Sequence, residues 1–147
     1  MEDMYTMFDS SLPSDSQNKG PRTAQPGFNV ACRIQEELEK RGHQVTPVEK
    51  YLDVGWSFLI RPIRLFRLKA NILCLLTRSG GERNWLLMTE QTPVAVINQD
   101  DTHYLRLLGE IRVVLSEPVF TNLGPWITRR DYVEMEREAA SRIQSKA

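Results

Sequence analysis

The spacing of apolar residues after position 28 predicts a helix. Val30, Ile34 and Leu38 recur every four positions, which is the spacing of one face of an α-helix. Gly42 follows this stripe, and glycine readily adopts the left-handed conformation that closes a helix. We therefore expect a helix over residues 28–41.

The pattern then changes to a period of two, which is typical of β-strands. Trp56, Phe58 and Ile60 alternate with their neighbours, and the run 72–76 is apolar at every position. A continuous apolar run is typical of a central strand that is covered on both faces. The region 45–90 is therefore expected to hold several strands.

A glycine pair at positions 80 and 81 predicts a tight turn, because glycine tolerates the positive φ values of short hairpins. We expect residues 70–78 and 84–90 to form the two arms of this hairpin.

Two further helices are expected towards the C-terminus. Residues 98–102 are rich in side chains that cap helices, and an apolar stripe follows them at Tyr104, Leu108, Ile111 and Leu115. Residues 119–120 and 126–127 flank a turn and are expected to form a last strand or a short hairpin. A final helix begins at Asp131, with a thin apolar stripe at Tyr132, Met135, Ala139 and Ile143.

The first 26 residues differ in composition from the rest and are expected to form a flexible tail. They are rich in serine, proline and glycine, so they bury too little apolar surface to offset the entropy of ordering. The cluster Met4–Phe8 is the exception; it either docks on the domain or on a partner, or does nothing specific. The predicted fold is one α+β domain over residues 27–147. It has a mainly antiparallel sheet of four to five strands, two helices on one face and an extra C-terminal helix.

Composition favours a cytoplasmic protein without a strong electrostatic attraction to nucleic acid. Nineteen basic residues balance nineteen acidic ones, so the net charge is zero. Cys32 and Cys74 lie in apolar-periodic segments and are expected to be buried, reduced thiols. The longest apolar run is too short to span a bilayer, and the first residues lack the features of a secretory signal.

Few residues in the sequence point to catalysis. His43 follows a helix-closing glycine and is expected near the last helix carbonyls. The tetrad Asp100, Asp101, Thr102 and His103 is the best candidate for a metal site, although such residues at a helix start are far more often caps. We therefore expect no enzyme activity, no cofactor and no resident metal.

A basic run with nearby aromatic residues is the main candidate for binding. Arg61, Arg64, Arg67 and Lys69 lie close together in the sequence. In a strand Arg67 and Lys69 would share a face and Arg64 would take the other, so they would not form one continuous patch. We therefore do not expect nucleic-acid binding, and contact with an acidic protein, or protection of a sheet edge, fits these residues better. Trp56, Trp85 and Trp126 are each expected in a strand, packed in the core or, if exposed, anchoring an interface.

The segments Arg41–Val45 and Gly55–Phe58, together with the order of elements over residues 27–127, resemble small cytosolic α+β proteins of bacteria. These include immunity proteins that neutralise a cognate toxin. The resemblance implies a binding protein without catalytic residues, and it transfers no site.

The expected function is a non-enzymatic protein-binding module that occludes a partner, with toxin neutralisation as its sharpest form. The alternatives are a homodimeric structural or regulatory subunit, a small-ligand binder, and an enzyme with an unrecognised site. The expected contacts with the partner protein are Asp53, Trp56, Arg61, Arg64 and Arg67.

Overall fold

The computed structural model describes residues 3–12, 26–61, 72–79, 83–91 and 102–145. These residues contain the elements β1 (Met4–Ser10), α1 (Phe28–Lys40), β2 (Gln44–Val45), β3 (Glu49–Tyr51), β4 (Gly55–Arg61), β5 (Ile72–Arg78), β6 (Trp85–Gln91), α3 (Thr102–Val114), β7 (Phe120–Thr121), β8 (Ile127–Thr128) and α4 (Arg129–Ser145).

The strands form one antiparallel sheet in the order β2-β4-β5-β6-β1-β7, with β3 also paired to β4 and β8 also paired to β1. The predicted hairpin is confirmed, since β5 and β6 pair with Arg78 opposite Trp85. The turn glycines 80 and 81 lie outside the described residues.

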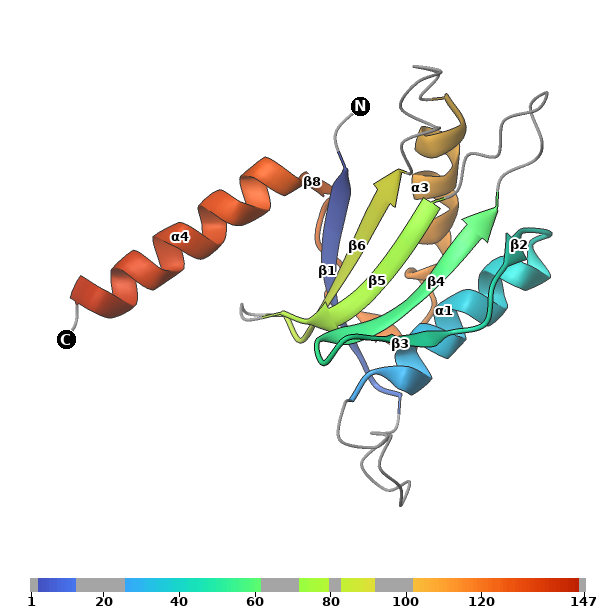
Figure 1. Cartoon of the computed structure of the whole chain (residues 1–147), viewed down its shortest axis with the longest axis horizontal. Coiled ribbons are helices and arrows are strands. Elements are labelled where there is room, and N and C mark those ends of the chain that lie inside the picture. Colours follow the sequence, from blue (N-terminus) through green and yellow to red (C-terminus); the bar gives the residue numbers. More distant parts are fainter. Residues whose placement is uncertain (1–2, 13–25, 62–71, 80–82, 92–101, 146–147) are drawn as a thin grey trace.

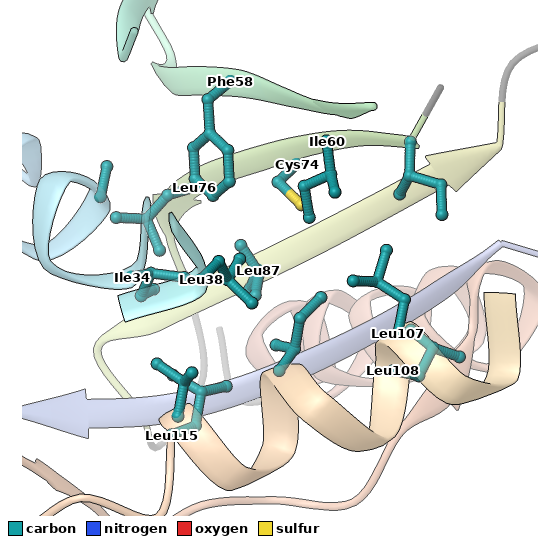
Figure 2. Packing of buried hydrophobic residues seen from close by; sticks show 14 of the residues in the cluster. Ile34, Leu38, Phe58, Ile60, Cys74, Leu76, Leu87, Leu107, Leu108 and Leu115 are labelled. Atoms are coloured by element: carbon teal, nitrogen blue, oxygen red, sulfur yellow. The ribbon is translucent and has the colours of Figure 1, made fainter. Parts of the chain in front are cut away.

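Helices α1 and α3 lie side by side behind the sheet, whereas α4 extends away from the sheet edge that β1 and β8 form (Figure 1). The core lies between these two helices and the sheet. Figure 2 shows Ile34 and Leu38 of α1 beside Leu87 of the sheet, and Leu107 of α3 directed towards the sheet further along; all four belong to one core cluster. This confirms the α+β class with an antiparallel sheet.

The end of α1 confirms the prediction made from Gly42. This glycine has a φ of 95°, and its N–H donates to the carbonyl of Glu39 at 3.0 Å. The backbone N–H of His43 donates to the carbonyl of Leu38 at 3.1 Å, which completes the closing turn.

The prediction of a flexible tail over residues 1–26 is wrong for residues 4–10. These residues form β1, which pairs with β6 on one side and with β7 and β8 on the other. Phe8 is fully buried, and its ring packs edge-on against Phe120 with the ring centroids 5.5 Å apart. Of the alternatives left open for the Met4–Phe8 cluster, the structure shows docking on its own domain. Residues 13–25 lie outside the described part.

The sheet also has more strands than the four or five expected. The described residues form eight strands. β1 joins the sheet, and residues 44–51 and 120–128 each contribute two short strands, β2 with β3 and β7 with β8. β7 and β8 do not pair with each other as a hairpin; each pairs with β1.

The two cysteines differ in burial. Cys74 is fully buried, and burial raises the pKa of its thiol. Cys32 is only half-buried, so the prediction of two buried thiols is correct for Cys74 alone. Both are free of disulfides. None of the described helices is long and apolar enough to cross a bilayer.

A buried polar network connects β1 to α3 and β6. The hydroxyl of Tyr104 accepts the backbone N–H of Met4 at 2.9 Å and lies 2.6 Å from the hydroxyl oxygen of Thr89. Thr89 donates its hydroxyl to the carbonyl of Met4 at 2.8 Å. Burial raises the pKa of Tyr104 to about 12. The hydrogen bonds with Thr89 and Met4 lower the pKa, but by less than burial raises it. The network therefore fixes the start of β1 on the helical layer.

Tyr104→Phe is expected to lower the free energy of unfolding by about 1–2 kcal/mol, because the Met4 N–H loses its acceptor. The raised pKa adds a pH dependence. Unfolded tyrosine ionises near pH 10, whereas folded Tyr104 keeps its proton to about pH 12. Stability linked to Tyr104 is therefore complete below pH 10 and is lost as the pH rises towards 12. Urea unfolding at pH 7 and pH 11 measures both effects. An equal alkaline loss in the wild type and in Tyr104→Phe would contradict this account.

Candidate functional site

The turn between β3 and β4 presents a group of apolar side chains to solvent. Tyr51, Leu52 and Val54 are all exposed, and the Leu52 side chain is 73% exposed. Asp53 lies among them, with its carboxylate 3.5 Å from the Lys50 ammonium. This ion pair is fully accessible to water at its acidic end and contributes little to stability. We call residues 51–54 the β3–β4 turn.

Leu52 adopts a backbone conformation that leucine rarely takes. Its φ is 48°, in the left-handed region, where a side chain other than Gly, Asn or Asp is disfavoured by about 1 kcal/mol. An exposed apolar side chain in that conformation stabilises neither the turn nor the core. A strained and exposed residue of this kind is a recognised indicator of function.

A cluster of aromatic rings supports this end of the sheet. Phe28 at the start of α1 packs against Trp56 of β4, with ring centroids 4.9 Å apart. Trp85 of β6 packs against the same core, and the guanidinium carbon of Arg78 lies 5.6 Å from the centroid of its indole ring. The β3–β4 turn therefore adjoins packed core side chains and does not belong to an isolated loop.

Gly27 explains how helix and sheet meet at this base. Its φ is 111°, and a Cβ there would lie 2.8 Å from the Trp85 ring and 3.5 Å from the Trp56 ring. Only glycine allows α1 to begin so close to both indoles.

The structure separates the residues that the sequence grouped as contacts. Asp53 is exposed in the β3–β4 turn, as a contact residue requires. Trp56 is only 6% exposed and belongs to the core, so its ring is not the exposed anchor that was expected. Arg61 is exposed but lies at the opposite end of β4, about 20 Å from the turn along the strand. Among the described contact residues, Asp53, Trp56 and Arg61 therefore do not form one exposed patch.

Arg64, Arg67 and Lys69 lie outside the described residues, as do Asp100 and Asp101. His103 lies in α3, but its side chain is not described, so the capping and metal readings of the tetrad stay predictions. The described residues contain no group of three or more His, Cys, Asp or Glu that would hold a metal ion.

His43 has a partner that the sequence did not indicate. Its ring nitrogen Nε2 is hydrogen-bonded to the carboxylate of Glu110, which connects the end of α1 to α3. The pair is only partly accessible to solvent and holds the two helices together. The geometry therefore gives the His43 ring a structural role.

The apolar residues of the β3–β4 turn were missed in the sequence. The available signal was the pattern Leu52-Asp53-Val54 ahead of Gly55, where polar turn residues are usual. The left-handed backbone conformation of Leu52 cannot be predicted from composition or periodicity.

Comparisons of the chain with known protein families, curated proteins and solved structures return no match.

Proposed function

We propose that the protein is a non-enzymatic protein-binding module that uses the β3–β4 turn as its contact. The single observation that carries this proposal is Leu52, which is exposed and held in a left-handed conformation. Neither property benefits the isolated fold, and both are accounted for if a partner covers the side chain.

The arrangement around Leu52 resembles the centre of a protein interface. Large apolar side chains form a core there, and charged groups lie at its edge. In this protein Tyr51, Leu52 and Val54 supply the apolar part, while Lys50 and Asp53 supply the charges. The partner is expected to offer a concave apolar site with polar groups at its rim.

The mechanism is occlusion. A projecting turn on a rigid base enters a cleft without ordering a flexible segment, which reduces the entropic cost of binding. If that cleft is the working site of a toxin, the module neutralises the toxin by filling it. Toxin neutralisation is thus the sharpest form of the proposal.

The test uses Leu52→Asn, because asparagine tolerates the left-handed conformation but removes the apolar side chain. We expect the variant to fold with equal or slightly higher stability, by up to about 1 kcal/mol. We expect its affinity for the partner to fall at least tenfold, as for loss of a central apolar contact. The partner is recovered from the source cells on the full chain, then purified and titrated by calorimetry.

The matched control is Leu105→Asn, since Leu105 is also exposed, at 53%, but lies on α3. It is expected to bind the partner as the wild type does. If the partner arrests growth when expressed alone, co-expressed wild type should restore growth and Leu52→Asn should not. Equal affinities of the two variants would overturn the assignment of the β3–β4 turn as the contact.

A further inference from the structure

Arg78, the last residue of β5, is an exposed arginine without an ion pair among the described residues. Its guanidinium carbon lies 5.6 Å from the centroid of the Trp85 ring, which is close enough for a cation–π contact. An arginine has five N–H donors, and contact with an aromatic face satisfies at most part of them. Arg78 therefore presents a positive charge and hydrogen-bond donors to solvent.

Two acidic residues at the same end of the sheet have other partners. The Asp53 carboxylate lies 3.5 Å from the Lys50 ammonium. The Asp9 carboxylate accepts the backbone N–H of Asn84 at 2.7 Å. Neither carboxylate pairs with Arg78, so its charge remains uncompensated among the described residues.

The position of Arg78 is fixed by its neighbours. Arg78 and Trp85 lie opposite each other in the pairing of β5 with β6, and just beyond them the backbone N–H of Ser79 donates to the carbonyl of Asn84 at 2.9 Å. Trp85 packs against the core cluster, and Gly27 approaches its ring so closely that a Cβ there would lie 2.8 Å away. A cation held over a fixed ring loses little further entropy when it binds an anion.

Arg78 also lies beside the β3–β4 turn. Thr77 pairs with Gly55, so the next residue of β5, Arg78, lies alongside Val54, the last residue of the turn. Figure 1 shows the turn and the end of β5 at the same end of the sheet. Val54 and Phe28, at the start of α1, are both exposed. An exposed cation thus borders the apolar side chains that the proposed function assigns to the interface.

We propose that Arg78 binds a carboxylate of the partner protein, an acidic side chain at the rim of the cleft that receives the β3–β4 turn. This inference rests on the proposed function, because it takes that turn as the contact. Arginine and tryptophan are among the residue types that most often dominate the energy of an interface. A carboxylate matches the planar arginine fork with two parallel hydrogen bonds, and such charge-assisted bonds are about twice as strong as neutral ones.

The surroundings of Arg78 favour a carboxylate over a phosphate. A nucleic acid or an anionic membrane is bound by several cations that act together. Lys50, the cation at the start of the turn, is already paired with Asp53, and the chain has no net charge. An arginine next to apolar side chains therefore fits an acidic side chain on a protein surface.

The probe for this site is the dipeptide N-acetyl-leucyl-aspartyl amide, with the uncharged N-acetyl-leucyl-asparaginyl amide as its match. Two-dimensional NMR of the full chain follows the Nε–H signals of Arg78 and of Arg61, an exposed arginine at the far end of β4. Each dipeptide is added to about 50 mM at constant ionic strength, because ligands of this size bind in the millimolar range at best. We expect the acidic dipeptide to shift the Arg78 signal about threefold more than the Arg61 signal. The amide dipeptide should shift neither.

Three results of this titration would overturn the carboxylate site. The first is an equal response of Arg78 and Arg61 to the acidic dipeptide, including no response of either. The second is an equal response of Arg78 to the acidic and the amide dipeptides. The third is a response of Arg78 to inorganic phosphate but not to the acidic dipeptide, which would identify a phosphate site instead.

Affinity for the partner, purified through the full chain, tests whether the carboxylate contact serves binding. Arg78→Gln removes the charge and the fork, and Arg61→Gln makes the same change at the far end of β4. We expect Arg78→Gln to lower the affinity about tenfold or more, as for loss of a hydrogen bond to a charged group. We expect Arg61→Gln to bind as the wild type does. Circular dichroism checks that both variants fold.

The two proposals fail in different ways. If Leu52→Asn weakens binding while Arg78→Gln binds as well as Arg61→Gln, the turn is the contact and the role of Arg78 is overturned. If Leu52→Asn and Arg78→Gln both bind as the wild type does, the proposed function is overturned as well.

Discussion

A chain from which residues 1–11 have been removed is expected not to fold. The deletion takes away β1, which lies inside the sheet between β6 and the pair β7 and β8. Loss of the buried Phe8 ring alone is expected to cost about 3–5 kcal/mol. In addition, the edge of β6 loses its partner strand, and the hydroxyl of Tyr104 loses its hydrogen bond from the N–H of Met4. Together these losses are comparable with the whole stability of a typical domain, about 5–15 kcal/mol.

The measurement is thermal unfolding followed by circular dichroism and tryptophan fluorescence. The shortened chain should show no cooperative transition. The control removes the same length from the other end, residues 137–147, and keeps the Tyr5–Tyr132 contact. Because residues 137–142 are all exposed, this control should unfold cooperatively near the wild-type temperature. A cooperative transition in the chain without residues 1–11 would show that β1 is dispensable.

Gly55→Ala is expected to lower the free energy of unfolding by about 3 kcal/mol. A Cβ on Gly55 would lie 2.2 Å from the carbonyl oxygen of Leu76, far inside contact distance. The obstacle is backbone, so no side-chain rotation relieves it. β4 and β5 would have to separate next to the pair formed by Trp56 and Leu76, both of which are in the core.

The matched control for this substitution is Gly109→Ala in the interior of α3. Among the described residues, a Cβ there meets no atom within 4 Å apart from its own stretch of helix. Alanine is a better helix former than glycine, so this variant should be more stable by about 0.5–1 kcal/mol. Urea unfolding of the two variants should therefore give shifts of opposite sign. A Gly55→Ala protein within 1 kcal/mol of the wild type would contradict the close approach of β4 and β5.

The periodicity of the sequence was sufficient to predict the elements whose defining residues lie close together in the chain. The stripe of α1, its closing Gly42 and the hairpin of β5 and β6 all follow from residues close together in the sequence. Burial of the alternating residues of β4 followed the same rule, since Trp56, Phe58 and Ile60 all face the core.

β1 could not be recognised in this way. Its partner residues lie between 77 (Phe8 to Trp85) and 124 (Met4 to Thr128) positions further along the chain, and the polar segment that follows it in the sequence suggests disorder. Thr6 illustrates the difficulty, because a fully buried threonine looks like a solvent-exposed residue in sequence. Its hydroxyl donates to the carbonyl of Gly124 at 3.0 Å, and only the folded chain provides that acceptor.

The candidate site was predicted only in part, for a related reason. The sequence drew attention to the junction at Asp53 and Trp56, where the structure exposes Asp53 and buries Trp56. It did not indicate which side chains point outwards. Leu52 and Val54 are exposed while Trp56 is buried, because the hairpin register and the contact with α1 decide the orientation of each residue.

Hydrogen–deuterium exchange of the full chain with and without its purified partner tests the proposed contact most directly. The account predicts slowed exchange at the amides of residues 50–56 in the complex, with α3 unchanged. Unchanged exchange at residues 50–56 in a saturated complex, with protection on another surface, would contradict it.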